Sequence, residues 1–592
     1  MLVDFSLEDT VALTRHLLLA AEDHATSHSI LRGLLCVVIV LAWTAWRCWK
    51  FTVYPWLHPD EPKELPYFIP ILGTYVADTL SSGIINQPRG HYSPWRVFLQ
   101  GLKWVTRACE VSECLIHITA PKQSTAYLPT NSQHRRYFAS TGTTPFALTA
   151  FGHTFYVVTH PKDSAAVYRN TESLSFDEFV QALMRFNGND EWTIKNVHQP
   201  LPATTKAGFA NPEGLSMINL TQRMHMHQLH PGEKMAVFQL QIRDWLNRKL
   251  TLDVLASTDS TDTGQSSVDS VELPLYQWTS DWFVRLGQHL YFGDVLERVD
   301  PEYTDNFVVF DEVIWKMLYQ YPSLLCRDMT VPRDRMIASM KAYLQLHPDE
   351  RRGQAAWLIN SLEDEFRGIG VDDNNLAILF FHLYFAINTN SRKTSFWVLT
   401  HMMRNPSCIA AFRSETAPAF DGDDLVDMAY IQDADKCPTV DAIWLETLRV
   451  AGWAASVRLV ARDVVIGGKV LRAGNRIMVP HRLLHFDSAF AGDEPTAWRP
   501  GRWLDSDAGR KMHKSPSWHP FGGGKTVCSG RFLAKGMVMA FVSTILRRFD
   551  IEAVGNPPMP QPDVGRPVLG IISAMEGQDY RVKVTRRKEA SA

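Results

Sequence analysis

The segment HPFGGGKTVCSGRFLAKG, residues 519–536, constrains the fold more than any other stretch of this sequence. Three consecutive glycines, residues 522–524, allow backbone conformations and close approaches that side chains would prevent. Cys528 ends the loop, and the residues from Gly530 onward have the spacing of an amphipathic helix. A helix N-terminus and backbone N–H groups favour the thiolate, the form of cysteine that binds a metal. The segment predicts a metal-binding cysteine or, alternatively, a glycine-rich helix cap around a buried structural cysteine.

The composition limits the class of protein. The 592 residues are 45% hydrophobic and 21% charged, with a formal net charge of −3, which is typical of a globular protein. This nearly balanced charge gives no reason to expect nucleic acid binding. The eight cysteines are scattered without a CxxC pair, which argues against zinc ribbons, iron–sulfur clusters and disulfide scaffolds. We therefore expect the main body in a reducing compartment.

An apolar span near the N-terminus predicts a membrane anchor. Residues 30–51 are mostly apolar and uncharged at their centre. A membrane helix needs about 20 residues, so Arg32 and Arg47 would have to extend toward opposite interfaces. The acidic leader, residues 1–29, disfavours a cleaved signal peptide, although a buried core helix stays an alternative. Arg47 and Lys50 follow the span, so the positive-inside rule predicts a luminal leader and a cytosolic body.

The rest of the chain is organised as a connector and one large domain. Residues 52–82 are rich in proline and predict an extended connector, followed by a single helix-rich domain at 83–592. Within it, residues 145–161 have the pattern of a β-hairpin. Residues 456–480 alternate like short strands with glycines at the turns, and long helical spacing dominates residues 275–413. We predict a mainly α fold with small β-sheets (α+β).

Five loop positions carry a family resemblance. Phe521, Gly524, Cys528, Gly530 and Ala534 match the FxxGxxxCxGxxxA haem-binding signature of the cytochrome P450 enzymes. This resemblance implies the cytochrome P450 fold with an N-terminal transmembrane helix. It also implies haem b as cofactor, with the Cys528 thiolate as axial iron ligand and the other four positions in cofactor binding.

Further segments resemble the same family. Glu446 and Arg449 of ETLR, together with Arg502 of PTAWRPGRW, match a structural Glu-Arg-Arg cluster behind the haem. Taken alone, ETLR is equally compatible with a solvated surface pair that contributes only about 0.3 kcal/mol. Arg458 of SVRLVARD matches an arginine that binds a haem propionate, a role suited to a guanidinium. Thr526 stands where many members have a basic residue for a propionate, so Arg458 is expected to carry that contact.

The central helix departs from the general family pattern. Residues 386–397, AINTNSRKTSFW, occupy the place of the AGx(D/E)T oxygen-activation stretch. Ile387 replaces the usual glycine, Thr389 the acid and Asn390 the threonine. An amide can hold dioxygen or a water by hydrogen bonds but supplies no proton as an acid does. The pattern resembles the steroid 7-hydroxylase and prostacyclin synthase-like branch and fungal biosynthetic members, so Asn390 and Thr389 are the candidate catalytic residues.

The resemblance implies a function with alternatives. We expect a haem-thiolate monooxygenase that oxidises a hydrophobic small molecule in fungal secondary-metabolite biosynthesis. Its electrons would come from a separate NADPH–cytochrome P450 reductase, and its location would be the endoplasmic reticulum membrane. The alternatives are a reductase-independent isomerase or dehydratase of a peroxide substrate, and a non-catalytic haem-binding sensor. Residues 90–131 match nothing in the family and are interpreted as an insertion or a mis-spliced stretch.

Overall fold

The structure is a computed structural model that describes a defined part of the chain. The described residues are 27–64, 144–150, 153–203, 205, 208–258, 269–318, 325–564 and 568–587. The predicted insertion lies outside them, as do most of the predicted leader and most of the connector.

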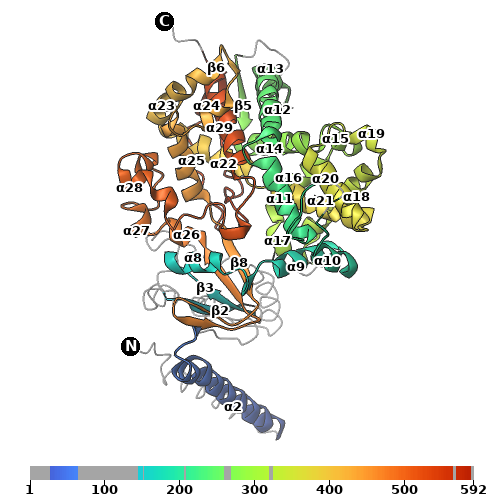
Figure 1. The fold of residues 1–592 in the computed structure, drawn as a ribbon. Coiled ribbons are helices and arrows are strands. Elements are labelled where there is room, and N and C mark those ends of the chain that lie inside the picture. Colours follow the sequence, from blue (N-terminus) through green and yellow to red (C-terminus); the bar gives the residue numbers. More distant parts are fainter. Residues whose placement is uncertain are drawn as a thin grey trace.

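The N-terminal part forms a helix that extends away from the body (Figure 1). Helix α2, Ser27–Cys48, continues into a π-helical turn, Trp49–Val53, and into α3, Tyr54–Leu57. Several apolar side chains of α2 are exposed, Leu41 the most at 63%. No helix in the described part of the chain has both the length and the apolar character that crossing a membrane requires. The predicted transmembrane anchor is therefore not confirmed and stays a prediction.

A six-stranded sheet lies between α2 and the helical body (Figure 1). Its strands follow the order β1-β2-β3-β11-β8-β4. Strands β2 and β3 are antiparallel, and β11 pairs antiparallel with β8 and parallel with β3. The strands predicted at 145–161 and 456–480 are thus confirmed. The bounds are β1 Lys63–Glu64, β2 Phe146–Ala150, β3 His153–Val157, β4 Leu174–Ser175, β8 Ala455–Val460 and β11 Arg476–Pro480.

Smaller sheets complete the β structure of the described residues. Strands β9 and β10 form the hairpin between β8 and β11, and Gly467 and Gly468 at its turn have φ of 57° and 72°, a region that favours glycine. A three-stranded sheet has the order β12-β13-β5. The bounds are β5 Ser270–Pro274, β6 Phe420–Asp421, β7 Asp424–Leu425, β9 Val464–Ile466, β10 Lys469–Leu471, β12 Phe549–Ala553 and β13 Arg581–Arg586.

Helices build the rest of the body, on the side of the six-stranded sheet away from α2 (Figure 1). This agrees with the predicted mainly α fold. The bounds are α8 Pro161–Arg169, α9 Asp177–Asn187, α10 Glu191–Val197, α11 Met217–Leu229, α12 Glu233–Lys249, α13 Leu252–Thr258, α14 Leu275–Phe292, α15 Val295–Val299, α16 Tyr303–Val313, α17 Trp315–Leu318, α18 Arg327–Gln345, α19 Pro348–Arg351, α20 Trp357–Gly368, α21 Asp373–Asn388, α22 Ser391–Met403, α23 Pro406–Thr416, α24 Met428–Gln432, α25 Pro438–Ala451, α26 His481–His485, α27 Ser488–Ala491, α28 Asp507–Arg510 and α29 Arg531–Arg548.

Helices α22 and α29 form the centre of the core. Helix α22 packs against α14, α25 and α29, and its residues Phe396, Val398 and Leu399 are at most 1% exposed. Helix α29 is buried over most of its length from Gly536 onward. The cysteine loop therefore leads directly into a helix that is fixed by the core.

The predicted central helix is interrupted, which corrects the expectation of one continuous helix through residues 386–397. Helix α21 ends at Asn388 and α22 begins at Ser391. At the break, the Thr389 hydroxyl lies 2.8 Å from the Phe385 carbonyl oxygen, and the Asn390 side-chain oxygen accepts a hydrogen bond from the Ile571 N–H at 2.9 Å. Such side-chain bonds to the backbone compete with the regular helix and bend it.

Candidate active site

The cysteine loop is a tight turn that requires glycine. Gly522 and Gly524 have φ of 75° and 62°, where other residues are strained. A Cβ on Gly523 would lie 2.8 Å from the Tyr168 ring, so this residue must also be small. The N–H of Cys528 donates to the Phe521 carbonyl at 3.0 Å and closes the loop. The loop thereby fixes Cys528 two residues before Gly530, the N-cap of α29.

The Cys528 thiol is accessible, but the surrounding protein crowds it. Its side chain is exposed, yet burial raises the pKa of the thiol, because surrounding protein desolvates it. The N–H groups of Gly530 and Arg531 and the Arg531 charge act in the opposite direction and favour the thiolate. This combination suits a cysteine that becomes a thiolate on binding a metal and does not suit a fully packed structural cysteine.

The surroundings of Cys528 leave room for a flat group. A Cβ on Gly530 would meet only the Cys528 sulfur, at 3.8 Å, which is an ordinary contact. Thus the described protein atoms do not by themselves require glycine at this position. Ala534 follows one turn later on the same helix, and its small side chain protrudes little from the helix surface. Both small residues fit a macrocycle that lies against the start of α29.

Arg458 is a buried cation without an acidic partner. Its residue is 8% exposed and lies on β8. It donates to the Val457 carbonyl at 2.8 Å and to the Thr526 hydroxyl, and its guanidinium lies 5.0 Å from the centre of the Phe176 ring. Within the described part of the chain, no carboxylate lies within ion-pairing distance of this guanidinium. Burial lowers the pKa of Arg458. Because an unpaired buried charge is unfavourable, this site fits a carboxylate such as a haem propionate.

Glu446, Arg449 and Arg502 form a closed buried cluster. The Glu446 carboxylate accepts from Arg449 Nε and Nη2 at 2.9 and 2.8 Å, and from Arg502 Nε at 2.9 Å. Glu446 and Arg449 are both 0% exposed. Arg449 also donates to the Pro495 and Ala497 carbonyls. The structure thus brings the three residues together, and they join α25 to the segment before residue 503. The Glu446–Arg449 pair is buried and is not a solvated surface pair.

The two candidate residues of the helix break have different partners. The Thr389 hydroxyl lies 2.7 Å from Oδ1 of Asp311, so its side chain belongs to a buried ionic cluster between α16 and α22. Asn390 contacts the backbone at Ile571. Neither side chain makes a hydrogen bond to the cysteine loop.

Sequence reasoning missed that ionic cluster. Asp311 accepts from Arg392 and lies 3.0 Å from the Lys393 Nζ, and both Asp311 and Arg392 have fully buried side chains. Burial opposes ionisation of Asp311, but the charges of Lys393 and Arg392 hold its pKa below the usual range. The adjacent pair Arg392-Lys393 between buried residues of α22 is the signal that could have revealed it, since buried charges need partners.

Comparisons with known proteins agree with this geometry. The family model Cytochrome P450 matches residues 303–573. Cytochrome P450 monooxygenase poxD of Penicillium oxalicum is 26% identical over 70% of this chain and 82% of its own length. Cytochrome P450 7A1 of Sus scrofa is 24% identical over 47% of this chain and 58% of its own length. The human 7-alpha-hydroxycholest-4-en-3-one 12-alpha-hydroxylase is 28% identical over 40% of this chain and 50% of its own length.

Fold, cysteine loop and relatives together define a haem-dependent oxidoreductase. The chain belongs to the cytochrome P450 superfamily, and its relatives include fungal monooxygenases and the steroid hydroxylase branch. It is an enzyme of the cytochrome P450 monooxygenase class.

Proposed function

We propose that this enzyme is a haem-thiolate monooxygenase of a hydrophobic small molecule, in which Cys528 would hold the iron of haem b. The observation that carries the proposal is the Cys528 thiol itself, which lies just before the N-terminus of α29, is accessible, and is desolvated by the surrounding protein. When bound, the haem supplies the activation of dioxygen. The protein supplies the binding, orientation and protons described below.

The residues around the loop hold the cofactor in this proposal. Arg458 pairs with a propionate and Thr526 orients its guanidinium, since these two side chains are already hydrogen bonded. Phe521, Gly524, Gly530 and Ala534 shape the loop and the face of α29 that the macrocycle contacts. The cluster of Glu446, Arg449 and Arg502 keeps α25 and the segment before the loop in place.

Asn390 orients a water for proton delivery. Its side-chain oxygen is engaged by the Ile571 N–H, so the amide nitrogen is the group that can donate to a water at the helix break. Thr389 supports the break through its hydroxyl, which lies within hydrogen-bond distance of both the Asp311 carboxylate and the Phe385 carbonyl, and acts as a positioning residue.

The electrons come from a separate NADPH–cytochrome P450 reductase, and the reaction belongs to fungal secondary-metabolite biosynthesis. Support for the setting comes from fungal relatives in Penicillium oxalicum, Hypoxylon pulicicidum and Penicillium decumbens. Co-expression with a fungal reductase, followed by product analysis of terpenoid, polyketide and alkaloid pools, should give NADPH-dependent oxygenated products. Efficient turnover of a peroxide without reductase would instead favour the isomerase, and ligand binding without any product would favour the sensor.

We also propose attachment to the endoplasmic reticulum membrane through the N-terminal helical segment, with a single pass and a cytosolic catalytic domain. The exposed apolar side chains of α2 and Trp56, which is 78% exposed, support contact with lipid. Deletion of residues 1–51 should move the enzyme from the membrane to the soluble fraction. Unchanged membrane binding after the deletion would contradict this role of the segment.

A further inference from the structure

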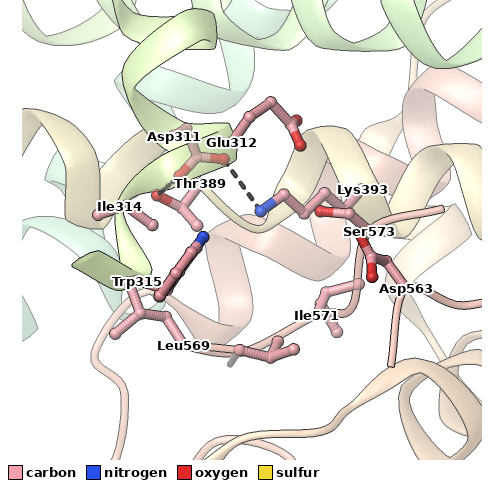
Figure 2. Close-up of a pocket in the computed structure, with 11 residues that line it drawn as sticks. Asp311, Glu312, Ile314, Trp315, Thr389, Lys393, Asp563, Leu569, Ile571 and Ser573 are labelled. Carbon is pink, nitrogen blue, oxygen red and sulfur yellow. Dashed lines mark hydrogen bonds and ion pairs between the residues drawn. The ribbon is translucent and has the colours of Figure 1, made fainter. Parts of the chain in front are cut away.

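A small pocket lies beside the break between α21 and α22 (Figure 2), and no residue of the cysteine loop lines it. It lies between the end of α16, the start of α22 and the C-terminal segment around residues 563–573. Thr389 and Ile571 line it, and Ile571 also binds Asn390, so the pocket shares a wall with the helix break. A molecule bound at the break would have one end beside this pocket.

Lys393 presents an incompletely bonded ammonium to this pocket. The residue is 5% exposed, and Figure 2 shows its nitrogen facing the Asp311 carboxylate. Its only ion-pair or hydrogen-bond partner in the described part of the chain is Oδ2 of Asp311, at 3.0 Å. An ammonium has three N–H donors, so two donors stay available toward the pocket. Buried donors without acceptors are unfavourable, and a ligand that brings an oxygen would satisfy one.

The same Asp311 oxygen is shared with Arg392, which leaves the ammonium weakly held. Arg392 donates to it through Nε at 3.1 Å and through Nη2, and Nη2 also donates to Glu312 at 2.8 Å. Arg392 alone thus provides Asp311 with two donors. Lys393 can turn part of its hydrogen bonding toward a ligand without leaving Asp311 unpaired.

The charges around the pocket select a neutral oxygen. Asp311, Glu312 and Asp563 line it and repel a carboxylate ligand, whereas the Lys393 ammonium repels an amine. A ligand group with either a negative or a positive charge would therefore be repelled. A carbonyl or hydroxyl oxygen accepts from Lys393 without introducing a charge.

The size and the walls of the pocket fit one such oxygen on an apolar skeleton. The cavity measures about 20 Å³, enough for a single water molecule or a group of similar size. Ile314, Val568, Leu569 and Ile571 form apolar walls, and Leu569 and Ile571 lie opposite the Asp311 carboxylate in Figure 2. A water molecule can occupy the pocket in the free enzyme. A ligand oxygen that accepts the same hydrogen bond can displace this water.

We propose that Lys393 anchors the substrate by donating a hydrogen bond to a carbonyl or hydroxyl oxygen, so that the substrate class is a neutral, oxygenated, otherwise apolar molecule. The proposal rests on the proposed monooxygenase function, because it assigns the far end of the same substrate. Lys393 acts in specificity and takes no part in the chemical step.

The test is a binding experiment on the haem-loaded enzyme. The probes are the hydrocarbons decalin and androstane, their ketones decalone and androstanone, and the carboxylate and amine derivatives of decalin. Kd is measured from the haem difference spectrum and, independently, from the shift in thermal midpoint. Each ketone should bind at least about tenfold more tightly than its hydrocarbon, as expected for one hydrogen bond from a charged donor, while the acid and the amine should bind more weakly than the ketone.

Variants assign that selectivity to Lys393. Lys393→Met should remove the ketone preference and leave hydrocarbon binding unchanged, whereas Lys393→Gln, which keeps a neutral donor, should retain part of it. Lys436→Met is the matched control, since this lysine is 53% exposed and pairs with Asp433 at 3.5 Å. If Lys393→Met incorporates too little haem for titration, the comparison of Lys393→Gln with wild type carries the test.

Equal affinity of wild type for a ketone and its hydrocarbon would overturn the proposal, as would the absence of binding for every oxygenated probe. An equal loss of affinity for hydrocarbons and ketones in the Lys393 variants would also overturn it. Each can occur in an enzyme that shows a normal thiolate spectrum, and then only the substrate assignment fails. Loss of the thiolate spectrum in the wild-type enzyme would instead refute the proposed function.

Discussion

At the scale of single residues, Asn390 connects two distant parts of the chain. Its side-chain oxygen accepts the Ile571 N–H at 2.9 Å, across 181 positions of sequence. A Cβ on Gly570 would overlap the Asn390 side chain, so this contact depends on glycine at 570. An alanine at 390 would leave a backbone donor unsatisfied beside the helix break.

We predict that Asn390→Ala lowers the free energy of unfolding by about 1–3 kcal/mol, the usual consequence of an unsatisfied buried donor. Haem content should stay intact, because the side chain is not a ligand. Product formed per NADPH oxidised should fall, because the amide that holds the relaying water is lost. Urea unfolding and a reductase-coupled assay measure the two effects.

Asn390→Asp separates the two roles of this residue. A carboxylate keeps the acceptor for the Ile571 N–H but removes the amide donor, so stability should stay near wild type while coupling still falls. If Asn390→Ala couples NADPH to product as well as wild type does, Asn390 has no part in proton delivery.

At the scale of elements, the Glu446 carboxylate joins α25 to the segment that precedes the cysteine loop. It also accepts from the Trp503 indole at 2.9 Å and the Arg499 N–H at 2.7 Å. Glu446→Ala would leave Arg449 and Arg502 buried without their counter-ion. Removal of one partner from such a cluster costs about 3–5 kcal/mol, so we predict a loss of this size in unfolding free energy, with reduced haem content.

An exposed pair provides the comparison for that loss. Asp507 and Arg510 are 86% and 60% exposed and lie 2.8 Å apart, so Asp507→Ala should cost less than about 1 kcal/mol. Chemical denaturation of both variants gives the two values. Equal and small losses would mean that the Glu446 cluster does not brace these elements.

The sequence predicted those elements whose signals are local. The glycines at 467, 468 and 474 have positive φ and divide residues 456–480 into the strands that are observed. The helix break and the ionic cluster between α16 and α22 depend instead on distant partners. Arg392 and Asp311 are 81 positions apart, and Ile571 is 181 positions from Asn390, so no local pattern identifies these contacts. The cysteine loop was recognisable because its glycines and helix start are contiguous, whereas the hydrogen bond from Arg458 to Thr526 spans 68 positions.

At the scale of the whole molecule, buried neutral histidines make stability depend on pH. Burial, reinforced by the charges of His519 and Arg458, lowers the pKa of His481 to about 3. The unfolded chain takes up this proton near pH 6.5, so the unfolded state binds more protons between the two values. The contribution of His481 is therefore complete above about pH 6.5 and decreases as the pH falls toward 3, by about 2 kcal/mol from pH 7 to pH 5.

Replacing this histidine should weaken the acid sensitivity. His481→Gln should make the dependence of unfolding free energy on pH shallower by about one proton between pH 5 and 6, measured by urea unfolding at a series of pH values. His347→Gln is the control, since the His347 side chain is 69% exposed. An unchanged slope in His481→Gln would show that His481 is not neutral in the folded enzyme.

The carbon monoxide spectrum of the reduced enzyme tests most directly whether Cys528 is the iron ligand. Wild type should show the strongly red-shifted Soret band of a thiolate-ligated haem, and Cys528→Ser should lose it. Cys408→Ser, which changes a partly buried cysteine on α23, should keep the band. Retention of the red-shifted band by Cys528→Ser would contradict the assignment of this cysteine and, with it, the proposed site.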